Sequence, residues 1–147
     1  MKLFDTNLIK INLTVTDKEQ LLEKMAGDLL SSGAIKNKED FLFLLMERES
    51  SDSTGIGRGI AIPHVRYKDV MMPKAVVYLL KDAVDYDSLD GNPVDIVIML
   101  ALPNFDIEQH KQILVFLSRS LREESDRKVL KQSRNANEVM EFFTRRQ

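Results

Sequence analysis

The sequence predicts an α/β protein in which a sheet lies between layers of helices. Two apolar runs, 75–80 and 94–102, are nearly continuous, which is typical of strands buried on both faces. Segments with helical periodicity lie before and after these runs, at 16–33, 38–49 and 107–123. Helices that alternate with buried strands favour a three-layer sandwich, with helices on both faces of the sheet.

The first elements are an extended segment over 8–15 and a helix that follows it. Thr16 and Glu19 have the spacing of a capping box at the helix start, and Gly33 is placed to end the helix. The apolar positions repeat at helical spacing and are expected to face the core: Leu21, Leu22, Met25, Ala26, Leu29 and Leu30.

A second helix is expected over 38–49, with Asn37 as its N-terminal cap. Its inner stripe holds Phe41, Leu44 and Leu45, and Arg48 continues the stripe at the next helical step. After this helix, 60–62 is expected to form a short buried strand. The turn at 90–93 then precedes the second long strand.

The C-terminal part is predicted to be helical. The helix over 107–123 has His110 on the same face as its apolar residues Ile113, Leu114, Leu117 and Leu121. A shorter helix is expected to follow, and then a last helix after Asn135. The apolar side chains of this last helix are expected to face the core: Val139, Met140, Phe142 and Phe143.

The composition is that of one globular domain covering residues 1–147, with 44% hydrophobic and 30% charged residues. No cysteine is present, which excludes disulfides, thiolate metal sites and cysteine nucleophiles. The net charge of -2 gives no reason to expect nucleic acid as a partner. There is no apolar run long enough for a membrane span and no signal-peptide core, so we expect no direct membrane insertion.

Acidic residues gather in the segment 82–108, which contains no lysine or arginine. Two interpretations are open. The segment is either a solvated loop region or a docking surface for a basic protein partner.

The segment 53–64, Ser-Thr-Gly-Ile-Gly-Arg-Gly-Ile-Ala-Ile-Pro-His, is the strongest motif of the chain. It places Gly55, Gly57 and Gly59 just before an apolar triplet, and it ends in His64, one of only two histidines. Glycines let the backbone approach a ligand closely, and the proline before the histidine fixes the backbone. The segment is therefore expected to present one imidazole from a rigid frame.

These residues suit a phosphoryl group carried on an imidazole. A neutral histidine is a competent nucleophile near pH 7. The backbone of Gly55, Gly57 and Gly59, the hydroxyl of Thr54 and the guanidinium of Arg48 are candidate ligands for the phosphoryl oxygens. Structural interpretations stay open, because either histidine could be a core residue and Arg48 could be a partner of the helix dipole.

The second histidine, His110, also follows an apolar strand, so both could lie near the carboxyl end of the sheet and meet there.

The sequence does not match the motifs of two other kinds of site. The glycines run G-x-G-x-G with no Walker-type lysine, which argues against nucleotide binding. The histidines lack H-E-x-x-H spacing, although carboxylates could complete a zinc site.

The chain resembles enzyme IIA of the fructose–mannitol class, from the bacterial phosphoenolpyruvate-dependent sugar phosphotransferase system. The resemblance rests on Arg48-Glu49, the glycine-rich segment 53–64, the segment 86–95, the strand ending at Pro103 and His110 near the start of its helix. It covers nearly the whole chain. One departure is Arg58, where many members of the family carry asparagine. This arginine either faces solvent or adds positive charge at the rim of the site.

The resemblance implies a cytoplasmic phosphotransferase that acts through a phosphohistidine. His64 would accept the phosphoryl group from the phosphocarrier protein HPr and pass it to a cysteine of an enzyme IIB, which works with the membrane permease enzyme IIC. His110 would assist the transfer, and Arg48 would help bind the phosphoryl group. The implied fold is a mixed sheet between helical layers, with no metal, nucleotide or other cofactor.

Two alternatives to sugar transport remain. One is a regulatory phosphoprotein of the nitrogen-related branch, or a domain of a transcriptional regulator, with the same fold and histidine. The segment 85–91, Asp-Tyr-Asp-Ser-Leu-Asp-Gly, favours the sugar branch. The other is an anion-binding scaffold without activity, against which the retention of His64 and His110 argues.

Overall fold

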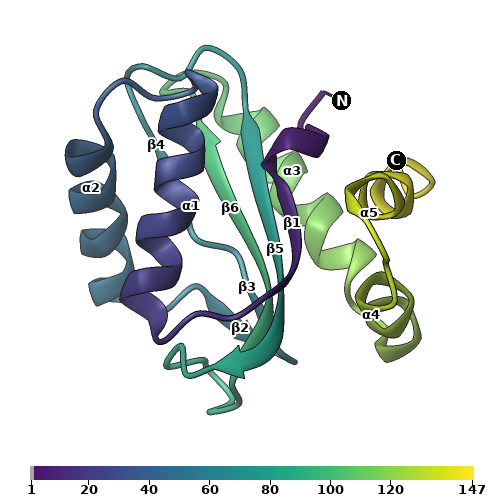
Figure 1. The fold of residues 1–147 in the computed structure, drawn as a ribbon. Coiled ribbons are helices and arrows are strands. Elements are labelled where there is room, and N and C mark those ends of the chain that lie inside the picture. The colour runs from purple at the N-terminus through teal and green to yellow at the C-terminus, as the bar shows by residue number, and fades with distance from the viewer. Residues whose placement is uncertain (1) are drawn as a thin grey trace.

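A mixed six-stranded sheet lies between two helical layers in the computed structural model, which describes residues 2–147 (Figure 1). This confirms the predicted α/β sandwich. Its strands are β1 (Ile9–Leu13), β2 (Gly55–Gly57), β3 (Ile60–Ala61), β4 (His64–Arg66), β5 (Lys74–Val84) and β6 (Val94–Leu102). Its helices are α1 (Lys18–Ser32), α2 (Lys38–Ser51), α3 (Ile107–Ser120), α4 (Glu124–Lys131) and α5 (Ala136–Thr144), with a short 3-10 turn, η1 (Thr6–Leu8), before β1.

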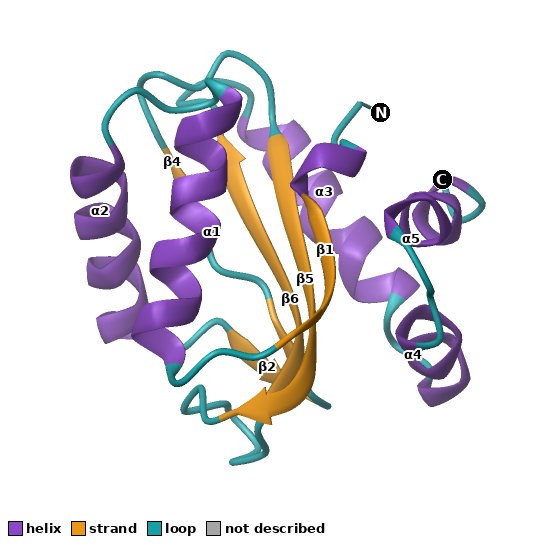
Figure 2. Cartoon of the chain, in the orientation of Figure 1, coloured by secondary structure: helices purple, strands orange, loops and turns teal. Residues whose placement is uncertain are grey.

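The strand order across the sheet is β1-β5-β6-β3-β2, and β4 also pairs with β6. The β1–β5, β3–β6 and β4–β6 pairs are parallel, whereas β5–β6 and β2–β3 are antiparallel. Figure 2 shows these strands in orange, with α1 and α2 on one side of the sheet and α3 to α5 on the other.

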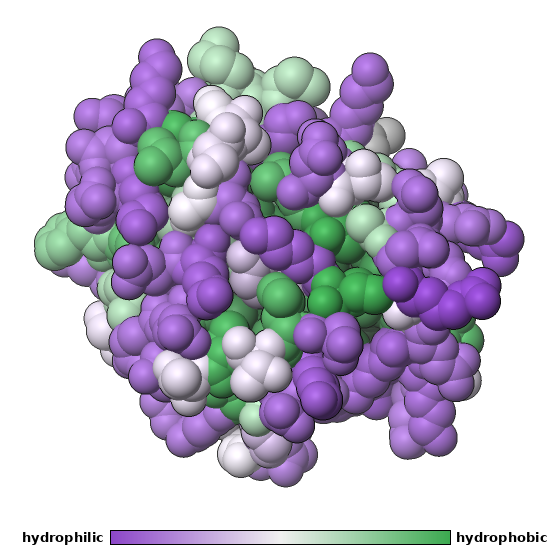
Figure 3. All heavy atoms as spheres, viewed as in Figure 1, coloured by the Kyte–Doolittle hydropathy of each residue, from purple (hydrophilic) through white to green (hydrophobic). Residues whose placement is uncertain are grey.

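The two long central strands bury both faces because each face packs against its own helical layer. Along β5, Val76 and Tyr78 join the core beneath α1 and α2, and Ala75 and Val77 join the core beneath α3 and α5. The predicted run over 75–80 is fully buried, but β5 continues to Val84. The prediction for 94–102 matches β6 to the residue. The edge strand β1 is less covered by helices, and its side chains Ile11 and Leu13 are half-buried. Figure 3 shows apolar side chains at the surface along this edge, between the two helical layers.

The helix starts and ends follow from their capping residues. Asn37 accepts a hydrogen bond from the amide of Asp40 at the start of α2, and Gly33 ends α1 in the left-handed conformation with φ 83°. The predicted cap at Thr16 is wrong by one residue. Asp17 is the N-cap and accepts from the amide of Gln20, whose side chain in turn accepts from the amide of Thr16.

Two further helical details differ from expectation. Leu30 is 40% exposed, because it lies at the outer edge of the apolar stripe of α1. The helix α3 ends at Ser120 rather than at residue 123, since α4 begins at Glu124 after a short turn. The helix predicted after Asn135 is α5, and the side chain of Asn135 caps it.

The segment that carries His64 is one interrupted strand. Ile60 of β3 lies beside Ile96 of β6, and His64, four residues later, lies beside Leu100 in the same register. The carbonyl of Pro63 accepts a hydrogen bond from the amide of Leu100 across the interruption. His64 is therefore part of the sheet at the start of β4, rather than beyond the end of a strand as the sequence suggested.

Candidate functional site: a histidine pair beside Arg48

The ring of His64 is fixed by its own backbone. Its Nδ1 atom lies 2.7 Å from the carbonyl oxygen of Ile62. Because a carbonyl oxygen can only accept, Nδ1 carries the proton of the neutral imidazole and donates to it. The other nitrogen, Nε2, then holds the free lone pair. The backbone thus selects the tautomer in which Nε2 is available as a nucleophile.

Burial keeps the His64 imidazole neutral. Removal of the ring from water lowers the pKa of His64 below its ordinary value of 6.5, and the hydrogen bond to Ile62 acts in the opposite direction. The positive charge of Arg48 lowers this pKa further, whereas the carboxylate of Glu49 raises it. The net direction is downward, so the side chain is in its nucleophilic form near pH 7.

His110 lies next to His64. It stands in the first turn of α3, whose N-cap Asp106 accepts a hydrogen bond from the amide of Gln109. The two rings meet edge to face, with their centroids 5.4 Å apart and an interplanar angle of 71°. The Nε2 atom of His110 is buried and has no hydrogen-bond partner among residues 2–147. Burial first, and then the charges of His64 and Arg66, lower the pKa of His110.

Arg48 lies near His64 and comes from the last turn of α2. One guanidinium nitrogen, Nη1, donates to the carbonyl oxygen of Asp52 at 2.8 Å, which holds the side chain against the loop that follows the helix. A guanidinium carries five N–H donors, so this bond leaves others for a ligand. Arg48 is half-buried like Leu44, four residues earlier, so the predicted continuation of the inner stripe runs along its edge, whereas Phe41, Leu45 and Glu49 are buried.

His64 and Arg48 line one pocket of about 370 Å³. The rest of its wall comes from the loop after α2, from β2, from the link between β3 and β4, from the segment after β5 and from α3: Asp52, Ser53, Thr54, Ile56, Ile62, Leu89, Leu114 and Ser118. Two of these, Ile56 and Leu89, are 43% and 73% exposed, so the rim of the pocket is apolar. Sequence reasoning did not identify Ser118 or Leu89, because only the fold brings their segments to His64.

The glycines of the motif do not line this pocket. They form a tight hairpin between β2 and β3, in which Gly57 and Gly59 have φ values of 98° and 80°. A Cβ on Gly57 would come within 3.0 Å of the carboxylate of Asp90, and one on Gly59 would come as close to that of Asp95. A Cβ on Gly55 would collide with Ser88. In this structure the glycines therefore shape the hairpin that precedes His64 and lie outside the wall of the pocket.

Arg58 lies at the tip of the same hairpin in the left-handed conformation, with φ 60°. Its amide donates to Asp90 at 2.9 Å, and its guanidinium donates to the carbonyl of Arg122 at 3.3 Å. The side chain is exposed, in line with one of the two interpretations, and its hydrogen bond also connects the hairpin with the turn between α3 and α4.

Thr54 is buried, and its hydroxyl is already engaged. It donates to the carboxylate of Glu49 and lies 3.0 Å from the hydroxyl of Tyr86. Glu49 also accepts from the ammonium of Lys18 at 2.9 Å and from the amide of Thr54 at 3.1 Å. Because burial and the charge of Glu49 act together, the pKa of Tyr86 is strongly raised and its hydroxyl stays protonated. This cluster was not predicted, although Glu49 follows Phe41 and Leu45 at helical spacing on the buried face.

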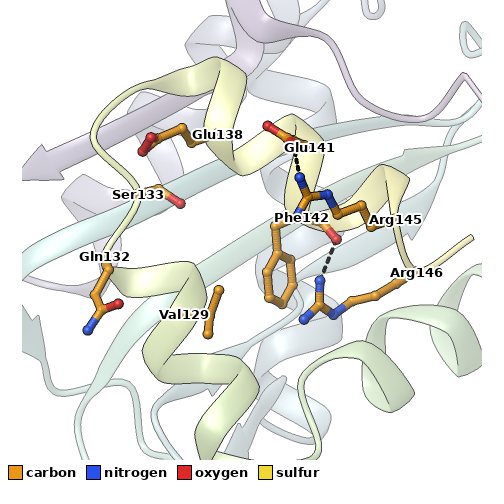
Figure 4. A pocket seen from close by; sticks show the side chains of 8 residues that line it. All are labelled: Val129, Gln132, Ser133, Glu138, Glu141, Phe142, Arg145 and Arg146. Carbon is orange, nitrogen blue, oxygen red and sulfur yellow. Dashed lines mark hydrogen bonds and ion pairs between the residues drawn. The ribbon is translucent and has the colours of Figure 1, made fainter.

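A larger hollow, of about 590 Å³, lies elsewhere, between α4 and α5 (Figure 4). No histidine lines it. Its arginines are held by partners close by: Arg145 pairs with Glu141, and Arg146 pairs with Asp126 and stacks over Phe142. Its arginines are thus already paired with carboxylates, so the pocket beside His64 is the better candidate site.

Two properties of residues 2–147 bear on other kinds of site. No three histidine, aspartate or glutamate side chains in this range gather closely enough to share a metal ion. Likewise, none of the helices in this part of the chain has the length and apolar character needed to cross a bilayer.

Known proteins with similar sequences include components of sugar phosphotransferase systems and nitrogen regulatory proteins. The PTS system fructose-specific EIIABC component of Bacillus subtilis (strain 168) is 33% identical over 142 residues, which are 97% of this chain but only 22% of that protein. The PTS system fructose-specific EIIA component of Haloferax volcanii is 31% identical over 92% of this chain and 88% of its own length. A nitrogen regulatory protein of Pseudomonas aeruginosa is 35% identical over 71% of this chain and 68% of its own length.

Solved structures show the same fold. Nitrogen regulatory protein IIA-Ntr from Neisseria meningitidis superposes with a TM-score of 0.91 at 27% identity and covers 97% of both chains. Enzyme IIA mannitol from Escherichia coli superposes with a TM-score of 0.80 at 23% identity, over 95% of this chain and 97% of that one. The family model described as "Phosphoenolpyruvate-dependent sugar phosphotransferase system, EIIA 2" matches residues 2–146. The chain therefore belongs to the type 2 enzyme IIA family of the sugar phosphotransferase system.

Proposed function

We propose that this protein is a cytoplasmic phosphocarrier in which the Nε2 atom of His64 carries the phosphoryl group. The observation that carries the proposal is the hydrogen bond from Nδ1 of His64 to Ile62, beside Arg48 in one pocket. It leaves an unprotonated nitrogen on a ring whose pKa is lowered, next to a guanidinium suited to a phosphate.

The donor in this proposal is the phosphohistidine of HPr. Its N–P bond breaks as a new P–N bond forms to Nε2 of His64, with the donor and acceptor nitrogens in line. No proton has to move, because the proton on Nδ1 stays in its bond to Ile62. Arg48 neutralises the charge on the phosphoryl oxygens, and His110, whose buried Nε2 has no partner in residues 2–147, would donate to one of them.

The acceptor is the thiolate of an enzyme IIB on a separate chain or domain. The P–N bond to His64 breaks as an S–P bond forms, and Nε2 regains its lone pair. One solved structure of similar fold is described as a complex of enzyme IIA mannitol with phosphorylated enzyme IIB mannitol from Escherichia coli. That protein's partner supports the choice of acceptor. Enzyme IIC, the permease, would receive the phosphoryl group only through enzyme IIB.

The phosphate site of this proposal differs from the one that the glycine motif suggested. Arg48 remains a ligand of the phosphoryl group. Thr54 contributes only to the wall of the pocket, because its hydroxyl is hydrogen-bonded to Glu49 and Tyr86. Gly55, Gly57 and Gly59 act by shaping the hairpin before His64, rather than as direct ligands of the phosphoryl group.

The test is phosphorylation from phosphoenolpyruvate with purified enzyme I and HPr, followed by intact mass. We expect an acid-labile gain of one phosphoryl group that is absent from His64→Ala. A stable adduct, or an adduct that persists in His64→Ala, would contradict the proposal. NMR of the phosphorylated ring identifies the nitrogen, and we expect Nε2.

A second candidate function is regulation through the phosphorylation state. The resemblance to the Pseudomonas aeruginosa nitrogen regulatory protein and to IIA-Ntr of Neisseria meningitidis favours it. Both candidates use the same phosphohistidine, so the discriminating measurement is the next step. Rapid transfer from phosphorylated His64 to an enzyme IIB favours transport. A stable phosphoprotein that no enzyme IIB discharges favours regulation.

A further inference from the structure

We propose that Glu49 is a positioning residue, which fixes the tautomer of His64 through Thr54 and Ile62. The consequence for phosphoryl transfer rests on the proposed function, but the tautomer itself is a property of the folded chain. Nothing in the phosphocarrier reaction requires this carboxylate to touch the phosphoryl group, and its place in the fold points to an indirect role.

Glu49 is 8% exposed, and both of its carboxylate oxygens are occupied. Oε2 accepts from Nζ of Lys18 and from the amide of Thr54. Oε1 accepts from the hydroxyl of Tyr86 at 2.9 Å and from that of Thr54. A buried carboxylate is stable only when it is paired and hydrogen-bonded, so this set of partners holds Glu49 and its neighbours in one arrangement.

Thr54 connects Glu49 with the strand that carries the imidazole through two backbone hydrogen bonds. Its amide is held by Glu49, and its carbonyl oxygen accepts from the amide of Ile62 at 3.0 Å. The carbonyl of Ile62 in turn accepts from Nδ1 of His64 at 2.7 Å. Three hydrogen bonds therefore connect the buried carboxylate with the ring by way of Thr54 and Ile62, each of which takes part in two of them.

The same cluster also anchors the rim of the pocket. The carbonyl of Tyr86 accepts from the hydroxyl of Ser53 at 3.1 Å, and Lys18 stacks over the ring of Tyr86 at 4.2 Å from its centroid. Leu89, three residues on from Tyr86, donates its amide to the carbonyl of Gly55 at 3.0 Å. Glu49 thus lies where α1, α2, the loop before β2 and the segment after β5 meet.

Two substitutions separate the hydrogen bonds of Glu49 from its charge. Glutamine at this position keeps an oxygen for Lys18 and the Thr54 amide, and its NH₂ group can donate to the two hydroxyls, which can turn to accept. Alanine removes every one of these bonds. If Glu49 acts through hydrogen bonds, Glu49→Gln retains the tautomer of His64 and Glu49→Ala loses it. The matched control is Glu47→Ala, an exposed glutamate on the same helix.

The measurement is the tautomer of His64 in the unphosphorylated protein at pH 8, read from the ring nitrogen shifts by ¹⁵N NMR. We expect a single tautomer with the proton on Nδ1 in the wild type, in Glu49→Gln and in Glu47→Ala. In Glu49→Ala we expect a mixture of both tautomers. A single Nδ1 tautomer in folded Glu49→Ala would overturn the proposal.

Glu49→Ala leaves the partly buried ammonium of Lys18 without its carboxylate partner, which destabilises the fold. A second variant therefore tests the same point without an unpaired charge. The double substitution Lys18→Met with Glu49→Leu removes both charges and keeps the volume, a change that buried ion pairs commonly tolerate. We expect this variant to fold and to show the same mixture of tautomers as Glu49→Ala. Retention of the single tautomer here would equally overturn the proposal.

Phosphorylation by HPr is then measured on the same samples. With the tautomer mixed, we expect the initial rate to fall several-fold for Glu49→Ala and to stay near the wild-type rate for Glu49→Gln. If the wild type forms no phosphohistidine, the proposed function fails while the tautomer result still stands. If the wild type is phosphorylated and the tautomer does not depend on Glu49, only the positioning role fails.

Discussion

His64 and His110 meet edge to face at 5.4 Å, although one belongs to an edge strand and the other to the first turn of α3. Both rings have a lowered pKa, chiefly because of burial, and the charge of His64 contributes to the shift of His110. In the proposed reaction, His64 would supply the lone pair for attack and His110 an N–H for a phosphoryl oxygen.

Substitution of His110 is expected to slow phosphoryl transfer with little effect on folding. His110→Ala removes a donor that we place beside the transferred group, and loss of such a donor costs on the order of 10²-fold in rate. The measurement is the initial rate of phosphorylation by HPr, with thermal unfolding of the same sample as the control. A large drop in the unfolding temperature with an unchanged rate would assign His110 to the core instead.

The pH dependence follows from the two lowered histidine pKa values. Above pH 6.5 both rings are neutral in the folded and the unfolded chain, so their contribution to stability is fully present. Below pH 6.5 the unfolded chain takes up protons before the folded one does, and stability is lost as the pH falls through the folded-state pKa values. Denaturant unfolding between pH 5 and 8 checks this, and a His64→Gln, His110→Gln variant should flatten the curve.

The transfer rate is expected to follow the same titration. Protonation removes the lone pair of Nε2, so the rate of phosphorylation should stay level from pH 8 to 6.5 and fall only below that range. NMR titration of both rings supplies the matching midpoints. A midpoint of His64 above 6.5 would contradict the burial and the Arg48 contact on which the expectation rests.

Arg48 is expected to act through the shape of its guanidinium as well as its charge. Arg48→Lys keeps the charge but loses the guanidinium fork, which donates to Asp52 and would also reach a phosphoryl oxygen in the proposed reaction. We expect a lower rate for Arg48→Lys, a still lower rate for Arg48→Met, and an unfolding free energy within about 1 kcal/mol of the wild type for both. Equal rates for arginine and lysine would show that charge alone suffices.

The glycines of the hairpin are expected to matter for stability. Gly57→Ala places a Cβ at φ 98° and within 3.0 Å of Asp90, so we expect a loss of about 1–3 kcal/mol in chemical denaturation. Gly27→Ala is the matched control. It lies in α1 with no atom within 4 Å of the added carbon, and it should stabilise the protein by about 0.5–1 kcal/mol. If the two changes have equal effects, the strain at Gly57 is absent.

Local patterns determined much of the fold. Continuous apolar runs predicted the two central strands because each of these strands is covered on both faces, and β6 matches to the residue. Asn37, Gly33 and Asn135 predicted helix ends because a cap acts within one turn of the chain. The motif before His64, together with Arg48 and His110, was enough to indicate the family and the residues of the candidate site.

Tertiary structure decided what those residues contact. Only the sheet register places the acidic side chains of Asp90 and Asp95 against the hairpin glycines, and only the packing of α1 on α2 brings Lys18 to Glu49. The tautomer of His64 depends on a backbone carbonyl, which no side-chain pattern encodes. The order of the elements and the motif around His64 can be predicted from the chain, because they depend on neighbours in the sequence. The chemistry of that imidazole depends on segments far apart in sequence, and the fold alone brings them together.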